Sequence, residues 1–146
     1  MEDMKSEGKS IQSTTLIITG EDLVPSEVSS LLGLEPKRFR QKGTVPPDMR
    51  PDGALRFPGR ISESGLWKVW IDEILSLSLE EQIEYWCGKI EYNREGFRII
   101  SERGYQIILD CYIDPGTVTT YELKPALLEC LASADIILNI TVNVST

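Results

Sequence analysis

The sequence contains no histidine, and this absence removes a large part of enzyme chemistry. Catalytic triads, histidine–cysteine dyads and histidine proton shuttles all need an imidazole. Most zinc and non-haem iron sites need one as well. The phosphate-binding patterns GxxxxGK(S/T) and GxGxxG are also missing. We therefore expect no catalytic residues, no metal site and no cofactor, and we predict that the protein is not an enzyme.

Cysteine is scarce, and no two cysteines have the CxxC spacing: the three are Cys87, Cys111 and Cys130. Their odd number and wide separation argue against a disulfide framework. Each falls on an apolar position of a predicted helix or strand, where a free cysteine behaves as a small hydrophobe. We predict three reduced thiols that fill space in the core.

Long hydrophobic runs are absent too. No apolar stretch approaches the roughly 20 residues of a membrane span, and the opening MEDMKSEGKS has no apolar signal core. We therefore expect a cytoplasmic protein without a membrane partner. The 15 basic and 23 acidic side chains give a net charge of −8. Nucleic acid is an unlikely partner for this balance, because phosphate binding needs a basic footprint.

The whole chain has 146 residues, of which 41% are hydrophobic, and this is the composition of one globular domain. β-Branched residues and period-two alternation predict strands over residues 14–20, 65–71, 105–113 and 136–144. Helical spacing predicts helices that begin near Pro25, Ser78, Asn93 and Pro125. Residues 1–12 are polar and are predicted to form a disordered tail. Residues 13–146 then form a single α+β domain.

The alternation of the last two strands indicates how the layers are arranged. In 136–144, every second residue from Ile136 to Val144 is apolar, and polar residues stand between them. A strand covered on both faces would instead be continuously apolar. We therefore predict a two-layer α+β sandwich of ferredoxin-like character. Its four- to five-stranded sheet is mixed or antiparallel, helices cover one face, and the second face is partly open.

A long loop over residues 36–60 differs from the rest of the chain, because it contains five prolines and little apolar sequence. Seven basic side chains there oppose only two aspartates, so the remainder of the chain is more acidic than the net charge suggests. The candidate binding residues combine these cations with aromatic rings: Lys37, Arg38, Phe39, Arg40, Lys42, Arg56 and Arg60, with Trp67 next to them. Three interpretations remain open: a solvated loop paired with the acidic body, an anion or single-stranded nucleic acid contact, or a contact with a partner protein.

Two tryptophans, Trp67 and Trp70, lie in one predicted strand and point to opposite faces. We expect one of them to enter the core near Trp86. The other would then lie on the open face, where a tryptophan is a plausible interface anchor.

Several segments together resemble a known bacterial family. They are the opening LIITGEDLVPSEVSSLLGLEPKRFRQKG, then GLWKVW and SLEEQIEYW, and finally LKPALLECLASADIILNITVNV. This combination resembles the family labelled domain of unknown function 4279 over about residues 14–144. The resemblance supports the fold and implies no particular activity. Small bacterial proteins of this kind often accompany toxins as immunity proteins, which is an argument by analogy.

From these observations we expect a non-enzymatic cytoplasmic domain that binds another protein. Its most specific form is a toxin-neutralising immunity protein, because an acidic body attracts a basic toxin. The alternative is a small anion- or nucleotide-binding module, or an enzyme, that uses the basic loop over residues 37–60. The sequence leaves the oligomeric state open.

Overall fold

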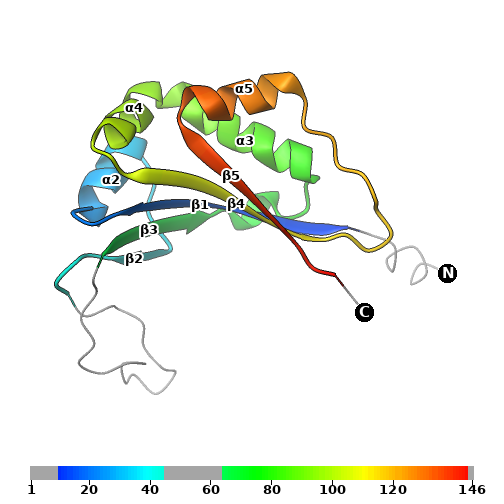
Figure 1. Cartoon of the computed structure of the whole chain (residues 1–146), viewed down its shortest axis with the longest axis horizontal. Coiled ribbons are helices and arrows are strands. Elements are labelled where there is room, and N and C mark those ends of the chain that lie inside the picture. The colour runs from blue at the N-terminus through cyan, green and yellow to red at the C-terminus, as the bar shows by residue number, and fades with distance from the viewer. Residues whose placement is uncertain (1–9, 45–63, 145–146) are drawn as a thin grey trace, which may run out of the picture.

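Five strands form one sheet, and the helices lie against one of its faces (Figure 1). The structure is a computed structural model that describes residues 10–44 and 64–144. Along the chain, the elements are β1 (Ile11–Gly20), α2 (Pro25–Leu32), β2 (Arg38–Arg40), β3 (Gly65–Trp70), a 3-10 turn (Asp72–Ile74), α3 (Leu79–Tyr92), α4 (Arg94–Glu102), β4 (Gln106–Asp114), α5 (Pro125–Ser133) and β5 (Ile136–Val142).

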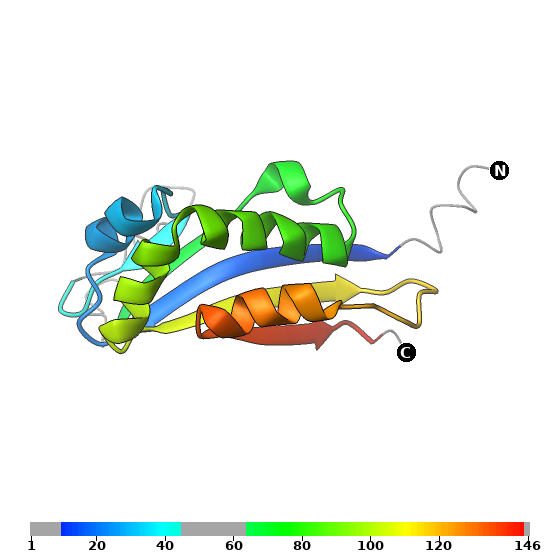
Figure 2. The same ribbon diagram turned by 90° about the horizontal axis from the view of Figure 1, so that it is seen from above.

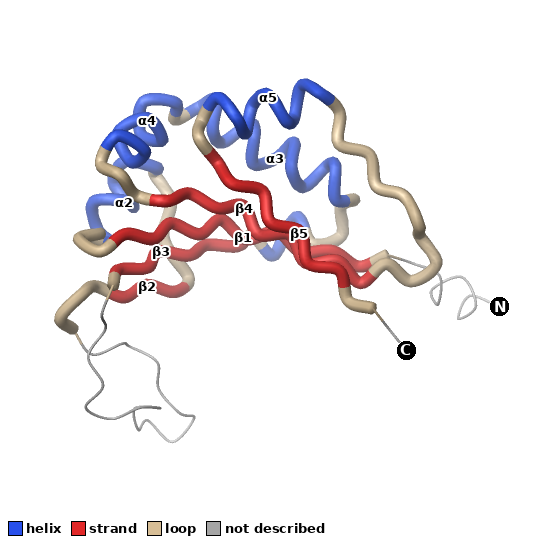
Figure 3. Tube along the Cα trace, viewed as in Figure 1, coloured by secondary structure: helices blue, strands red, loops and turns tan. Residues whose placement is uncertain are grey.

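The sheet is mixed, with the strand order β2-β3-β1-β4-β5. β1 is antiparallel to both β3 and β4, and β2 is antiparallel to β3. β4 and β5 are parallel, which requires a crossover connection, and α5 lies in that connection. Figure 3 shows the helices on one side of the sheet. The predicted two-layer α+β fold with a mixed sheet is therefore confirmed.

The core lies between the sheet and the helices, and period-two alternation selects the residues that enter it. Leu16 and Ile18 of β1 are buried, and so are Trp67 and Val69 of β3. α3 covers the middle of this face and contributes the fully buried Ile83. Figure 2 shows α3 running along β1 and α5 running along the β4–β5 pair. The amphipathic stripes of the helices thus close a single hydrophobic core.

A buried chain of hydrogen bonds joins α3 to β1. Trp86 donates from Nε1 to Thr14 Oγ1 at 2.8 Å, and Thr14 donates to Gln82 Oε1 at 3.0 Å. Gln82 then donates from Nε2 to the backbone oxygens of Gln12 and Leu77. Gln82 and Thr14 are only 0% and 1% exposed, so these bonds replace the water that both side chains would otherwise bind.

The predicted tail boundary is wrong by two residues. β1 begins at Ile11, and Gln12 is buried because its side-chain amide donates to Leu77 O at 2.7 Å. In the sequence, a polar residue such as Gln12 resembles part of a disordered tail, because the hydrogen-bond partner that buries it is not visible there. Residues 1–9 lie outside the described residues, and so do residues 45–60 of the predicted long loop. Within the described part of that loop, Arg38–Arg40 forms the edge strand β2.

The prediction that the alternate apolar residues of the last strand all enter the core is only partly correct. Ile136 is buried and Leu138 is half-buried, but Ile140, Val142 and Val144 are exposed. The reason is the length of α5: its nine residues extend about 13 Å, whereas the seven residues of β5 extend about 23 Å. The helix therefore covers only the beginning of β5.

The predicted helix starts at Pro25 and Ser78 are confirmed. Pro25 occupies the first turn of α2, and the helix ends at Gly33, whose φ of 66° is left-handed. Ser78 and Glu81 form the expected capping box: the Ser78 hydroxyl accepts from Glu81 N, and the Glu81 carboxylate accepts from Ser78 N.

Replacing the cap should weaken α3. We expect Ser78→Ala to lower the free energy of unfolding by about 0.5–2 kcal/mol, because the Glu81 N–H in the first turn loses the hydroxyl oxygen that it donates to. Urea unfolding of mutant and parent measures this difference. Coincident midpoints would show that the cap contributes nothing.

Two helical glycines have opposite surroundings. A Cβ atom on Gly96 would overlap the backbone carbonyl oxygen of Leu31, because α4 packs directly on α2 there. A Cβ atom on Gly88 of α3 would meet nothing within 4 Å. The first glycine permits a close helix contact, and the second only weakens its helix.

Alanine at these two positions should therefore have opposite effects. Gly88→Ala is expected to raise the free energy of unfolding by up to about 1 kcal/mol through helix propensity. Gly96→Ala is expected to lower it by about 1–3 kcal/mol, because the methyl group separates α4 from α2. Thermal or urea unfolding of both variants measures the two changes. If Gly96→Ala were as stable as Gly88→Ala, the α2–α4 contact would be looser than described.

Candidate functional site

The pairing of β2 with β3 separates the sequence-predicted binding residues onto two faces. Arg38 lies opposite Lys68, Phe39 opposite Trp67, and Arg40 opposite Leu66. Successive residues of a strand point to opposite sides, and directly paired residues share a side. Arg38 and Arg40 are therefore on the open face of the sheet, whereas Phe39 is on the side of the helices.

Trp67 was expected to contribute to the binding surface, and the structure corrects this. Its side chain is 0% exposed, and its Nε1 donates to Ser29 Oγ of α2 at 3.1 Å. A side chain in this position is part of the core and cannot reach a ligand on the open face. Phe39 follows Trp67 onto the helix side but remains 46% exposed, because it lies on the edge strand.

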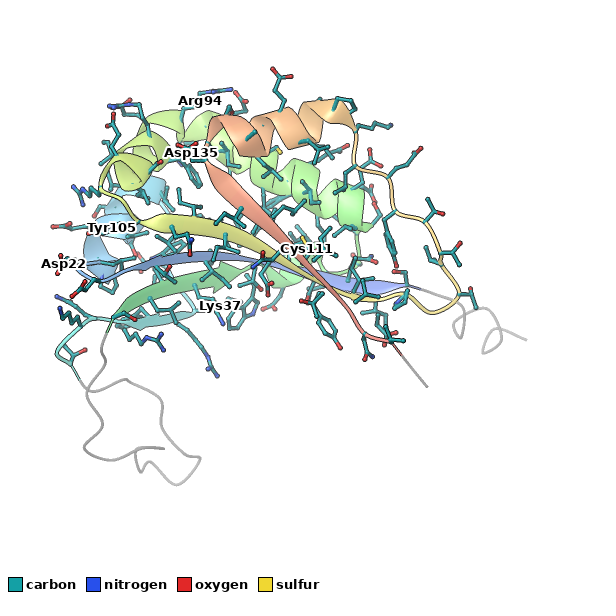
Figure 4. All side chains as sticks on the ribbon, viewed as in Figure 1. Asp22, Lys37, Arg94, Tyr105, Cys111 and Asp135 are labelled. Carbon is teal, nitrogen blue, oxygen red and sulfur yellow. The ribbon has the colours of Figure 1, made fainter. Side chains whose placement is uncertain are left out.

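Two candidate cations are already paired with acidic residues. Lys37 donates to Asp72 Oδ2 at 2.9 Å, and its Nζ lies 5.3 Å from the centre of the Trp70 ring (Figure 4 labels Lys37). Lys42 donates to Glu21. This hydrogen bond and the opposite charge lower the pKa of Glu21 and raise that of Lys42. For Lys37 and Lys42 alone, these contacts fit the first interpretation, in which the cations of the loop pair with acidic residues of the same chain.

The other candidate cations, Arg56 and Arg60, lie outside the described residues. Of the proposed set, β2 therefore places Arg38 and Arg40 together on one face, and Lys37 reaches the Trp70 ring from just before that strand. Lys68, which the sequence analysis did not include, joins them there through its pairing with Arg38. Arg40 and Lys68 have no ion-pair partner among residues 10–44 and 64–144.

A single row of side chains crosses the whole open face. Its members are paired strand by strand from β2 to β5, in the order Arg38, Lys68, Ile17, Ile108 and Ile137. The row is cationic at the β2–β3 end and apolar over the other three strands. The three isoleucines are partly or well exposed, and Ile137 reaches 41%. No described helix covers them (Figure 1).

Trp70 is on the same open face, one alternate position beyond Lys68 in β3. It is half-buried, and it pairs with Thr15, whose row continues to Asp110 and Asn139. The expectation that one tryptophan is buried and the other is on the open face is thus confirmed. We name the group Arg38, Arg40, Leu66, Lys68 and Trp70 the basic–aromatic surface.

The sequence already contained a signal for this surface. In the strand GLWKVW, Lys68 and Trp70 alternate with Trp67 and Val69, so burying Trp67 places the other two outside. The contributions of Ile17 and Ile108 could not be found in this way, because their strands are apolar on both faces at these positions. Only the sheet order shows that they lie beside Lys68.

The helical layer has the opposite character, because its exposed charges are mainly acidic. Several form pairs within a helix, Arg94 with Glu91 and Arg98 with Glu95 and Glu102, and Arg103 pairs with Glu27 of α2. A hollow of about 550 Å³ opens on this layer between α2 and α3, and Tyr85, Tyr92, Leu34 and Glu84 are among its lining residues. Tyr92 is 86% exposed. This layer therefore offers an acidic, tyrosine-containing surface.

The described residues bring together no recognisable set of reactive groups. Among residues 10–44 and 64–144, no three acidic or cysteine side chains are grouped so that they could hold a metal ion. Cys111 is 0% exposed in the middle of the sheet (Figure 4), and burial raises the pKa of its thiol to about 12. Burial beside Cys130 raises the pKa of Cys87 to about 12 as well. Both thiols are therefore protonated at neutral pH, when they are poor nucleophiles.

The thiols should differ in reactivity according to their burial. We expect an alkylating reagent to modify the half-buried Cys130 first in the native protein, and Cys111 only when the protein unfolds. Mass spectrometry of the labelled peptides over time gives the order, and the same reaction in denaturant is the control. Rapid native labelling of Cys111 would contradict the assignment of the β4 faces.

In the described part of the chain, no helix has both the length and the apolar character needed to cross a membrane.

Comparison with known proteins gives a match to one family. The family model described as domain of unknown function (DUF4279) matches residues 10–145, which is nearly the whole chain. No curated protein and no solved structure matches the chain. The match covers every strand and helix of the described fold, and the chain therefore belongs to the DUF4279 family.

Proposed function

We propose that this protein is a non-enzymatic, protein-binding domain that contacts its partner through the open face of the sheet. The observation that carries the proposal is the combination of Trp70 and three cations with an uncovered row of isoleucines. Loops and open surfaces that combine tryptophan and arginine with apolar side chains are typical of interfaces. The neighbouring row on this face, Thr15, Asp110 and Asn139, is polar, so the three isoleucines form one apolar row on a face that is otherwise suited to solvent.

The two halves of this face suit different parts of an interface. Ile17, Ile108 and Ile137 would lose their remaining water on binding. Ile17 and Ile108 are already half-buried, so each would contribute less than the roughly 1.5–3 kcal/mol that full burial of such a side chain is worth. Arg40 and Lys68 lie at the edge of this apolar row and would meet carboxylates of the partner. Charges at the rim of an interface act mainly on the association rate and on the choice of partner. The partner expected for this face is therefore a protein with an apolar patch beside an acidic one.

Neutralisation of a basic toxin is a separate and more specific form of protein binding, because it would use the helical layer and not the open face. The acidic helical layer, with its tyrosine-lined hollow, would steer a basic toxin towards it. A basic partner would thus use the helical layer, and an acidic partner would use the basic–aromatic surface. The surface that binds consequently distinguishes the two kinds of partner.

An anion-binding module is the second candidate, favoured by one observation. Arg38, Arg40 and Lys68 come from two adjacent strands and share one face, as cations that hold a phosphate group do. The same face carries Trp70, on which a base could stack. Among the described residues, no long helix begins beside these cations, so no helix N-terminus adds its amide groups to such a site.

Charge reversal on the open face should weaken partner binding. The partner is first isolated by capture on the immobilised protein from cells that make it, and is identified by mass spectrometry. We expect Arg40→Glu to weaken its binding about tenfold and to reduce the salt dependence of association. Titration calorimetry with the purified partner measures both.

Lys124→Glu on the helical layer is the matched control, because it changes the net charge equally and its side chain is exposed. It should leave the binding of an acidic partner within about twofold of the parent, since the new charge lies on the other layer. Equal loss in both variants would indicate a general charge effect and contradict the proposed surface. Binding of inorganic phosphate or a nucleotide that Arg40→Glu abolishes, without any captured protein, would favour the anion-binding module.

A further inference from the structure

We propose that two copies of this chain associate through β5, in an antiparallel pair centred on Asn139, so that their two sheets become one. This inference is separate from the proposed function. It concerns the β5 edge, which lies at the opposite end of the sheet from the basic–aromatic surface (Figure 1).

Among residues 10–44 and 64–144, no strand pairs with the outer edge of β5, which presents a row of backbone groups. Asn143 N donates to Ile113 O of β4 at 2.7 Å, so the odd-numbered residues of this segment turn their backbone groups inward. Because successive residues point their N–H and C=O groups to opposite edges, those of Ile136, Leu138, Ile140 and Val142 point outward. These groups are available to a further strand.

The two edges of the sheet are protected to very different extents. β2 is three residues long and contains two arginines, and short charged strands resist edge-to-edge pairing. β5 is seven residues long and contains neither a charged residue nor a proline. In a chain with a net charge of −8, an uncharged strand of this length is the place where two copies can approach with least repulsion.

Apolar side chains accompany this backbone edge. Ile140 and Val142 are each 46% exposed beyond the end of α5. On α5, Cys130 faces Cys87 of α3, so Leu128, about 160° away around the helix, is on the flank towards the β5 edge. Leu128 is 45% exposed. The helix layer therefore leaves an apolar margin along β5 that a neighbouring molecule would cover.

A second copy fits this edge because the strand is complementary to itself. With Asn139 opposite Asn139, antiparallel pairing places Leu138 opposite Ile140 and Ile136 opposite Val142, and each pair occurs twice. All four apolar pairs then lie on the helix side, and the outward backbone groups form about eight hydrogen bonds. A two-fold interface has this property by necessity, since the same patch serves both partners.

Sedimentation velocity over a concentration series tests the association. The wild-type protein should sediment as a dimer at high concentration, and Ile140→Lys should weaken dimerisation about tenfold or more by placing a charge in an apolar pair. Phe39→Lys is the matched control: Phe39 is also 46% exposed on an edge strand, and it should not change the dimer. A wild-type protein that remains monomeric overturns the proposal, and so does a dimer that Ile140→Lys leaves intact.

Cross-linking tests the register without depending on a disruptive variant. In the proposed pair, Asn139→Cys places two thiols directly opposite each other, in the non-hydrogen-bonded arrangement that brings Cα atoms to about 4.5 Å. Mild oxidation should convert this variant to a disulfide-linked dimer. Thr141→Cys, exposed on the same face of the same strand, lies opposite Ile137 and should stay monomeric on a non-reducing gel. Equal cross-linking of both variants, or of neither, overturns the antiparallel pair centred on Asn139.

Discussion

The buried hydrogen bonds between β1 and α3 are the constraint on which the arrangement of this molecule depends. Thr14 and Gln82 are enclosed in the core, and each would cost about 1–3 kcal/mol if its polar group lacked a partner. The observed placement of α3 over β1 satisfies Trp86, Thr14 and Gln82 together, and a shift of the helix would break this chain of bonds. Because β1 is the central strand, that placement fixes the helical layer relative to the whole sheet.

From this placement follows the division of the surface into two chemically different layers. The helices and their acidic side chains occupy one side, and the open side carries cations at one end of an apolar row. Both the proposed partner surface and the proposed β5 pair use backbone or side chains that the helices leave uncovered. The cationic end of the partner surface lies on β2 and β3, at the opposite end of the sheet from the β5 pair, whereas its apolar row reaches Ile137 in β5. A dimer would therefore carry one cationic end at each outer edge of the joined sheet.

Much of this fold could be predicted from local patterns, because alternation, caps and proline positions depend on neighbouring residues. The capping box at Ser78 and the opposite orientations of Trp67 and Trp70 are examples. The errors have non-local causes. Gln12 looked like tail because its partner, the carbonyl oxygen of Leu77 just before α3, is 65 residues away. Ile140 looked like core because only the length of α5 decides how far β5 is covered. The candidate binding residues could not be assigned to faces from the sequence, because only the pairing of β2 with β3 shows that Trp67 and Phe39 lie on the helix side.

The sheet order also bears on how fast the chain can fold. β1 comes first in the described sequence, yet its neighbours β3 and β4 begin at Gly65 and Gln106. Contacts between residues so distant in sequence are slow to form, because long loops must close first. The adjacent helices α3 and α4 need no such closure and can form early. The cost of closing a loop rises only about 0.6 kcal/mol for each doubling of its length. The long separations between β1 and its neighbours therefore add little to the cost of loop closure at equilibrium, and their main effect is on the rate of folding.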